Sequence, residues 1–321
     1  MSAIFLFAVI VLILLAVLDL WVGVANDAVN FTNSAIGAAV SSRRTILIVA
    51  SLGVFIGALF SSGMMEVARK GIFDPSFFCS AEGVLDINLI LVLYLGVMVA
   101  DVVMLDIFNT FGLPTSTTVS IVSDLLGAAV AVMLWKNGGD IRAAFSVINH
   151  GPVLGIYTGI FSSILVAFVA AAIGMTVMRF IFTRNLARSF RYFGWAWTGL
   201  SISSITYFVV FKGVASIPFL PESALIFIKG NIWPVLAVIF AASALTAHLL
   251  RDRYESIFRF LILAGTLGLA MSFAANDLVN FMGPTVAAAQ AVFVDNIKLA
   301  GNVPTPSWAL VAAGLIMVIS L

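Results

Sequence analysis

The sequence predicts an all-α polytopic membrane protein with about eight or nine transmembrane helices. Of its 321 residues, 62% are hydrophobic and 10% are charged, whereas soluble domains contain roughly 25% charged residues. The mean hydropathy is +1.16, and apolar stretches long enough to cross a bilayer recur along the chain. A soluble chain of this size could not hide so much apolar surface in one core. Lipid is therefore the expected solvent.

Charge and cysteine content exclude several classes of function. The formal net charge of +1 predicts no nucleic-acid partner. Cys79 is the single cysteine, which excludes an intramolecular disulfide and a metal site built from cysteines. Met1 leads directly into an apolar run without a basic region or a small-residue cleavage site, so we expect this run to be the first span.

Nine apolar segments are expected to span the membrane. They lie near residues 4–24, 45–63, 85–108, 117–135, 152–182, 196–211, 231–249, 257–275 and 307–321. The stretch 64–84 is polar and is expected to form a loop. Arginine clusters near Arg188 and Arg253 lie in connections that follow odd-numbered spans, which favours a cytoplasmic location for them. The N-terminus is then expected outside the cell, with the chain in the cell (inner) membrane.

A repeated motif lies at the edge of two of these spans. Residues 25–31 read Ala-Asn-Asp-Ala-Val-Asn-Phe, and residues 275–281 read Ala-Asn-Asp-Leu-Val-Asn-Phe. An Asn-Asp pair is costly to place in so apolar a chain, and a doubled polar break in apolar segments is typical of the central site of a secondary transporter. The sequence therefore predicts broken helices at the membrane midplane.

The two copies are expected to enter the membrane in opposite directions. They follow the first and the eighth expected spans, and an odd number of crossings reverses the direction of the chain. An inverted repeat of this kind suits alternating access around a fixed site. We expect residues 1–182 to form the first repeat, 183–256 to form connecting spans and basic loops, and 257–321 to begin the second repeat, which is incomplete.

The motifs have the chemistry of a cation site. Carboxylate and amide oxygens are a hard-cation ligand set, suited to Na⁺ rather than to a soft metal. The simpler alternative is that each Asn-Asp pair caps a helix end at the membrane surface. Two matching copies favour the binding site, with Na⁺ at Asp27 and Asp277. The predicted cation-binding residues are Asn26, Asp27, Asn30, Asn276, Asp277 and Asn280.

A second polar segment has the chemistry of an anion site. Residues 112–120 read Gly-Leu-Pro-Thr-Ser-Thr-Thr-Val-Ser. Pro114 favours the start of a new helix, whose free N–H groups and following hydroxyls suit an oxyanion such as phosphate or sulfate. Alone, this pattern would indicate only a capped turn. Beside the motifs it predicts a substrate site formed by Thr115, Ser116, Thr117 and Thr118.

The two segments together predict cation-coupled anion symport. Carboxylates repel an anion, so a site that combines them with anion-binding hydroxyls needs a cation to balance the charge. Other carboxylates are weaker candidates. Asp19, Asp101, Asp106 and Asp124 lie in or near spans, where an acidic group is either functional or turned toward water.

At these residues the chain resembles the PiT family of inorganic phosphate transporters. Family members carry two G-A-N-D-x-x-N-like signatures, and a P-x-S-T-T-H-like segment follows the first. The resemblance implies Na⁺- or H⁺-driven phosphate symport without a prosthetic cofactor, and it is compatible with a homodimer. It places Asn26, Asp27, Asn276 and Asp277 near the cations, with Ser116, Thr117 and Thr118 contacting phosphate.

The chain departs from the family pattern at three places. Val119 stands where the family often has His, and the second signature begins with Ala274 instead of Gly. No second Pro-Thr-Ser-Thr-Thr segment follows residue 281, and Leu321 lies inside an apolar span. We therefore expect the chain to be C-terminally truncated relative to the family.

Three alternatives remain open at this point. Sulfate or another oxyanion would suit the same hydroxyls, and the sequence does not choose between Na⁺ and H⁺. A membrane-embedded enzyme acting on phosphate esters or lipids would need a metal or acid–base cluster, and the sequence contains no His-rich cluster or H-E-x-x-H motif. A non-transporting membrane scaffold would leave the doubled carboxylates unexplained. We expect a transporter and not an enzyme.

Overall fold

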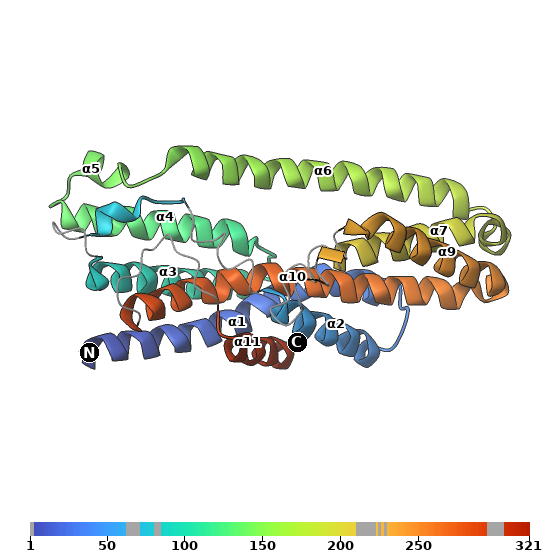
Figure 1. Cartoon of the computed structure of the whole chain (residues 1–321), viewed down its shortest axis with the longest axis horizontal. Helices are drawn as coiled ribbons and strands as arrows, with labels where there is room; N and C mark the ends of the chain where they lie inside the picture. Colours follow the sequence, from blue (N-terminus) through green and yellow to red (C-terminus); the bar gives the residue numbers. More distant parts are fainter. Residues whose placement is uncertain are drawn as a thin grey trace. The chain divides into compact units, whose positions relative to one another are not determined.

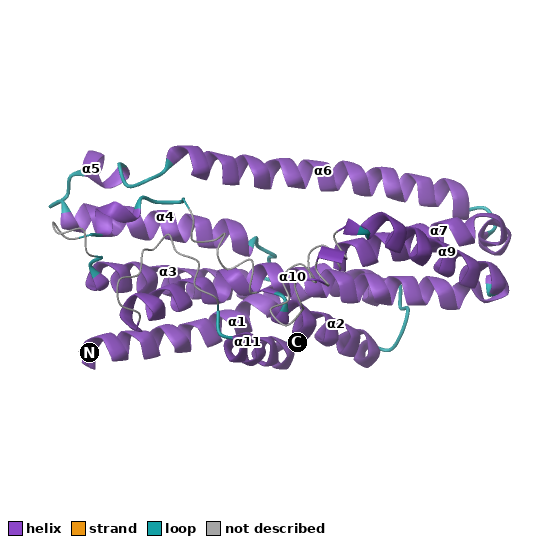
Figure 2. Ribbon diagram, in the orientation of Figure 1, coloured by secondary structure: helices purple, strands orange, loops and turns teal. Residues whose placement is uncertain are grey.

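The computed structural model describes residues 3–61, 71–79, 85–209, 223, 226–227, 230–293 and 305–321. The α-helices in these ranges are α1 (Ala3–Gly37), α2 (Arg43–Leu59), α3 (Ile87–Thr110), α4 (Thr117–Lys136), α5 (Ile141–Phe145), α6 (His150–Phe182), α7 (Leu186–Phe208), α9 (Ile232–Leu249), α10 (Tyr254–Phe293) and α11 (Ser307–Ser320) (Figure 1). Two short 3-10 helices are η3 (Pro75–Phe78) and η6 (Arg251–Arg253). Throughout the described ranges the regular structure is helical (Figure 2).

The helices agree with the predicted membrane fold. Each of the nine predicted spans overlaps one helix of the described chain, and the number of spans stays a prediction. Six helices in the described ranges are long and apolar enough to cross a bilayer, namely α1, α3, α4, α6, α9 and α10 with the turn before it. The most apolar part of α6 is not buried against the rest of the protein at all, so that surface needs lipid as its solvent. The protein is an integral, multi-pass membrane protein.

The polar breaks are not where the sequence placed them. Both Asn-Asp motifs lie inside continuous helices, because α1 continues to Gly37 and α10 continues to Phe293. Helical backbone runs through both motifs, so mainly their side chains need partners. The carbonyl of Asn280 is the exception, because Pro284 has no N–H to donate to it. The break in helical backbone lies instead between α3 and α4, at the hydroxyl-rich segment.

The predicted loop at 64–84 is partly described. Residues 62–70 and 80–84 lie outside the described residues. Between them, Asp74 accepts a hydrogen bond from the Ser76 backbone N–H and so caps η3. An isolated bridge pairs Phe73 with Ile148, just before α6.

The chain forms two compact units, each assembled from separated stretches. The first unit contains Met1–Val29, Phe55–Tyr157 and Phe273–Leu321, and the second contains Asn30–Val54 and Thr158–Ser272. Both motif-bearing helices therefore contribute to the first unit, together with α3 and α4. The expected division of the chain into two inverted repeats is a separate matter from these units, and it stays a prediction.

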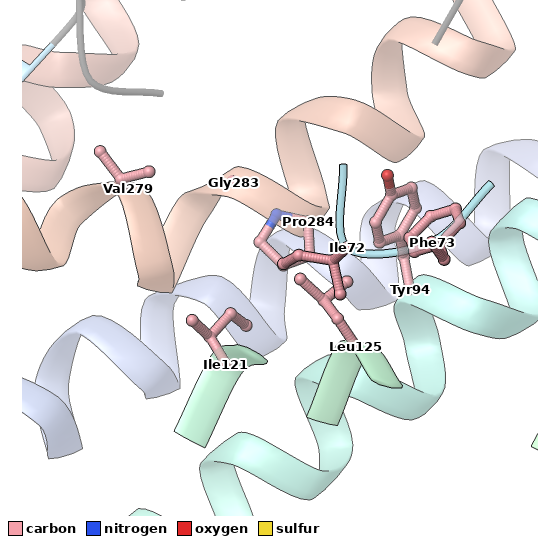
Figure 3. Close-up of a pocket in the computed structure, with 8 residues that line it drawn as sticks. All are labelled: Ile72, Phe73, Tyr94, Ile121, Leu125, Val279, Gly283 and Pro284. Atoms are coloured by element: carbon pink, nitrogen blue, oxygen red, sulfur yellow. The ribbon is translucent and has the colours of Figure 1, made fainter. Parts of the chain in front are cut away.

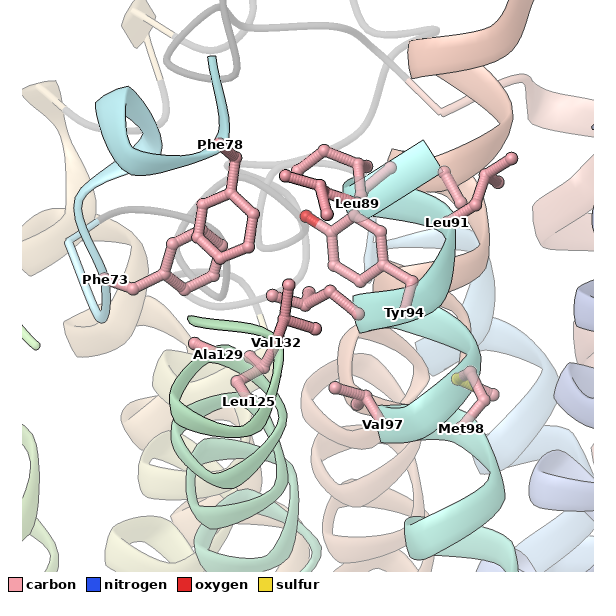
Figure 4. Close-up of a cluster of buried hydrophobic side chains, with 14 of the residues drawn as sticks. Phe73, Phe78, Leu89, Leu91, Tyr94, Val97, Met98, Leu125, Ala129 and Val132 are labelled. Carbon is pink, nitrogen blue, oxygen red and sulfur yellow. The ribbon is translucent and has the colours of Figure 1, made fainter. Parts of the chain in front are cut away.

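The first unit is held together by one apolar core. Tyr94 and Val97 of α3 and Leu125 and Val132 of α4 belong to this core, and Figure 4 shows Phe73 and Phe78 beside them. The two phenylalanine rings meet edge to face, with centroids 5.2 Å apart. This packing fixes α3 and α4 as an antiparallel pair.

The motif-bearing segments of α1 and α10 run in opposite directions within this unit. The hydroxyl of Thr285 donates to the carbonyl of Leu12 at 3.0 Å. Further along, Gly23 lies so close to the ring of Phe281 that a Cβ atom there would sit 2.2 Å from it. Only a glycine permits this approach, which brings the two motifs together. The antiparallel arrangement is what an inverted pair requires.

The second unit has its own apolar contacts. The ring of Phe258 in α10 meets the rings of Phe182 and Phe190 edge to face, at centroid distances of 5.6 and 5.3 Å. Gly53 of α2 approaches the backbone of α10, where a Cβ atom would lie 2.5 Å from the carbonyl oxygen of Leu267. Small residues permit such close helix packing in membranes.

Candidate functional site

The reversal between α3 and α4 is built by local sequence. Gly112 has a φ of +66°, which suits glycine. Its N–H donates to the carbonyl of Asn109 at 3.0 Å, and the N–H of Leu113 donates to the carbonyl of Phe108 at 2.9 Å. These are the two bonds of a Schellman motif, which ends a helix. Pro114 then prevents the helix from continuing.

A capping serine begins α4. Ser116 has an extended backbone, and its Oγ accepts a hydrogen bond from the N–H of Val119 at 3.4 Å. The N–H groups of the first helical turn have no partners within the helix and carry the positive end of its dipole. The hydroxyl-rich segment thus forms the tip of a helical hairpin, with helix α4 beginning at Thr117.

Asn26 attaches this tip to α1. Its Nδ2 donates to Asn109 Oδ1 at 2.7 Å and to the carbonyl of Leu113 at 3.0 Å. Its Oδ1 accepts from the N–H of Thr115 at 3.0 Å. Asn109 in turn donates to the carbonyl of Val22 at 2.8 Å. Asn26 therefore acts as a clamp, and its predicted cation contact stays a prediction.

Asp277 attaches the same tip to α10. The hydroxyl of Thr117 donates to Asp277 Oδ1 at 2.6 Å. Asn276 and Asn280 donate their Nδ2 groups to the same oxygen at 3.2 and 3.4 Å. The side chain of Asp277 is buried, with 4% of its surface exposed. One carboxylate oxygen thus receives three donors, from two helices.

The carboxyl group of the first motif lies in this network too. Asp27, which is 5% exposed, lies beside Asp277. Two adjacent buried carboxylates repel each other strongly unless they share a proton or a cation lies between them. Within the described residues, no group of three or more His, Cys, Asp or Glu side chains could hold a metal ion. Two carboxylates beside the hydroxyl oxygen of Thr117 are hard oxygen ligands of the kind that suits a monovalent cation.

Pro284 leaves one backbone carbonyl oxygen near this network without its helical hydrogen bond. It lies inside α10 and has no N–H, so it cannot form the helical hydrogen bond with the carbonyl of Asn280 four residues earlier. Pro284 and Gly283 line a small apolar pocket with Ile121 and Leu125 of α4 (Figure 3). The remaining lining residues are Ile72, Phe73, Tyr94 and Val279. The pocket lacks the charged and amide groups that an anion needs, so it serves as apolar packing beside the site.

Two hydroxyls of the hairpin tip are acceptors in the structure. Thr118 Oγ1 accepts from Asn276 Nδ2 and from Asn280 Nδ2, each at 3.4 Å. Ser116 Oγ accepts from Val119. The proton of each hydroxyl is therefore available for donation, whereas the proton of Thr117 is committed to Asp277.

The structure brings most of the predicted site residues together. The hairpin tip meets Asn26 of the first motif, and it meets Asn276, Asp277 and Asn280 of the second. Asn30 belongs to the other compact unit, so its role stays a prediction. The sequence patterns assign no role to Asn109, which accepts from Asn26 and donates to the carbonyl of Val22.

Comparison with known proteins shows to which family the chain belongs. The model of the phosphate transporter family matches residues 23–321. The chain belongs to this phosphate transporter family. The family is one of transporters, not of enzymes, which confirms that prediction. The hairpin tip and the two Asn-Asp motifs all lie within the matched residues.

Relatives and a solved structure agree with the family. A protein named as a phosphate permease in Thermococcus kodakarensis is 29% identical over 92% of this chain and 69% of its own length. A similarly named protein of Pyrococcus furiosus is 29% identical over 95% of this chain and 71% of its own length. A solved structure, that of a protein described as the sodium-dependent phosphate transporter, matches 98% of this chain and 74% of its own, with a TM-score of 0.72 and 20% identity. That likeness supports the fold.

Replacing Asn26 by alanine tests the clamp. Asn26→Ala removes three hydrogen bonds from the hairpin tip and leaves the N–H of Thr115 unpaired. We expect amide hydrogen exchange across residues 111–116 to accelerate, with a loss of about 1–3 kcal/mol of local stability. Asn33→Ala, at an exposed position of the same helix, is the control. Equal exchange in the two variants would contradict the clamp.

Proposed function

We propose that this transporter carries inorganic phosphate by cation-coupled symport, with Na⁺ as the coupling ion. The observation that carries the proposal is the hydrogen bond from Thr117 to Asp277. It connects the hydroxyl-rich segment, which suits an anion, to a buried carboxylate, which suits a cation. Binding at either place changes the environment of the other, and this is the requirement for coupling.

Phosphate binds at the start of α4 in this proposal. Ser116 and Thr118 have hydroxyl protons to donate, and the first turn of α4 adds N–H groups at the positive end of its dipole. Thr115 lies beside them in the chain. Thr117 contributes differently, because its proton already binds Asp277. Its oxygen can still contact a cation or accept the proton of hydrogen phosphate.

The cation binds between the two motifs in this proposal. Asp27 and Asp277 supply the negative charge and the carboxylate oxygens, beside the amide groups of Asn276 and Asn280, whose Nδ2 atoms donate to Asp277. The carbonyl that Pro284 leaves without its helical partner is a further ligand of the right kind. The structural neighbour is described as sodium-dependent, which supports Na⁺ over H⁺ at this site.

The proposal includes alternating access and an orientation. We place the protein in the cell (inner) membrane with its N-terminus outside, because the arginine clusters favour the cytoplasmic side. The inverted direction of α1 and α10 supports a rocking or sliding exchange of the site between the two sides. A homodimer would cover part of the apolar surface that α6 leaves exposed.

Phosphate is favoured over sulfate by the carboxylates of the site. Near neutral pH phosphate retains a proton that an adjacent carboxylate can accept, whereas sulfate has none to offer. A site built with such acceptors rejects an anion that leaves them unpaired. The hydroxyls of the hairpin tip would bind either oxyanion, so the carboxylates carry the discrimination.

Uptake into proteoliposomes tests the function. We expect ³²P-phosphate uptake driven by an inward Na⁺ gradient, with little uptake of ³⁵S-sulfate. Asp277→Asn should reduce Na⁺-driven uptake at least tenfold, whereas Asp252→Asn, at an exposed surface ion pair, should leave it unchanged. Sulfate uptake equal to that of phosphate would contradict the specificity, and full uptake by Asp277→Asn would contradict the cation site.

Phosphate binding by hairpin-tip variants tests the anion site. Ser116→Ala and Thr118→Val each remove one donor to a charged ligand, a bond worth about 1.5–3 kcal/mol. We expect each to weaken equilibrium phosphate binding about tenfold or more, because 1.4 kcal/mol corresponds to a factor of ten. Ser123→Ala on the outer face of α4 is the control. If all three variants bind phosphate equally well, the anion does not bind at this tip.

A further inference from the structure

A second group of buried carboxyls lies in the first unit, apart from the Asn-Asp motifs. Asp19 of α1 and Asp101 of α3 each have 0% of their surface exposed. Asp124 of α4 is half-buried. Asp19 interacts electrostatically with both of the others. Three helices thus direct one carboxyl group each toward a common point.

Ser120 connects two of these carboxyls. Its hydroxyl is within hydrogen-bonding distance of Asp101 Oδ1, and it lies 3.1 Å from Asp124 Oδ2. A serine hydroxyl has one proton and can donate it to only one of these oxygens at a time. The other contact brings two acceptor oxygens together unless that carboxyl carries a proton of its own.

Asp19 also lacks a compensating group. Within the described chain, no N–H or hydroxyl group donates to either carboxyl oxygen of Asp19 or to Asp101 Oδ2. The polar group within reach of Asp19 is the carboxyl of Asp101, and two carboxyls can hydrogen-bond to each other only if one of them carries a proton. An ionised, unpaired carboxylate in an apolar interior is very costly. The charged groups that face each of the three carboxyls are the other two, and all carry the same sign when ionised.

A proton removes these conflicts better than a metal ion does. Among the described residues, no cluster of His, Cys, Asp and Glu side chains has the arrangement of a metal site, and these three carboxyls are no exception. A shared proton turns one carboxyl into a donor, which satisfies Ser120 and lowers the mutual repulsion. We propose that Asp19, Asp101 and Asp124, with Ser120 between the last two, form a proton-binding site separate from the two Asn-Asp motifs.

The position of this proton site connects it to the hairpin tip. Ser120 follows Thr117 by three residues on α4, so the two side chains lie on one face of the helix. Thr117 binds Asp277, and Ser120 binds Asp101 and Asp124. Gain or loss of the proton therefore acts on the same helix start that binds phosphate. This link to transport rests on the proposed function, whereas proton binding itself does not.

Infrared spectroscopy of the purified full chain tests the site. A protonated carboxyl group has a C=O stretch that carboxylates lack. We expect this band at neutral pH, with partial loss of its intensity in Asp19→Asn and in Asp124→Asn. Asp106→Asn, on the exposed face of α3, is the matched control and should retain the band. Replacement of Na⁺ by choline at constant ionic strength should leave the band unchanged.

Two results would overturn the proposal. Absence of the band, or equal intensity in all variants, means that the cluster holds no proton. Loss of the band on addition of Na⁺ means that the cluster binds a metal ion instead. If the Asp19→Asn variant does not fold, the test rests on the Asp124→Asn variant, which replaces a half-buried side chain. A band that behaves as expected, in a protein without phosphate uptake in proteoliposomes, would support the proton site and contradict only the proposed function.

Discussion

The hydrogen bond between Thr117 and Asp277 is the interaction on which the rest of the site depends. It spans 160 residues of sequence and joins the tip of the α3–α4 hairpin to the middle of α10. A buried carboxylate in a membrane protein needs donors, and this one receives them from a hydroxyl and two amides. Without these donors the carboxylate could not stay in an apolar interior, and the hairpin tip would lose its attachment to the second motif.

The same constraint explains why groups that attract an anion lie beside groups that attract a cation. A helix start lined with hydroxyls attracts an anion, and adjacent carboxylates repel it. In the structure the hydroxyl of Thr117 joins the two by donating to Asp277. In the proposed function a cation completes the charge balance when the anion binds, so each ligand makes the site suitable for the other. Asn26 holds the tip on the other side, against α1. The two Asn-Asp motifs are thus similar in sequence but different in role: the first clamps the hairpin, and the second binds its hydroxyls.

The fold class and the site could be predicted in large part from the sequence. Composition alone required a membrane protein, and the doubled Asn-Asp motif with the Pro-Thr-Ser-Thr-Thr segment indicated the residues that meet. The backbone at the motifs could not be predicted. A polar pair in an apolar run suggests a break, yet Asn26 and Asp277 satisfy their side chains across helices and leave the helical backbone intact. The role of Asn109 as a partner of Asn26, and the burial of the carboxyl group of Asp19, depend on contacts between distant segments, which local patterns do not report.

The most direct test of the account is the thermodynamic coupling between Na⁺ and phosphate. Equilibrium phosphate binding to the purified protein would be measured with Na⁺ and with choline, for the wild type, Thr117→Ser and Thr117→Val. The account predicts that Na⁺ tightens phosphate binding in the wild type and in Thr117→Ser, which keeps the hydroxyl. In Thr117→Val the affinity for phosphate should no longer respond to Na⁺. Coupling of the same size in Thr117→Val would contradict the claim that this hydrogen bond joins the two sites.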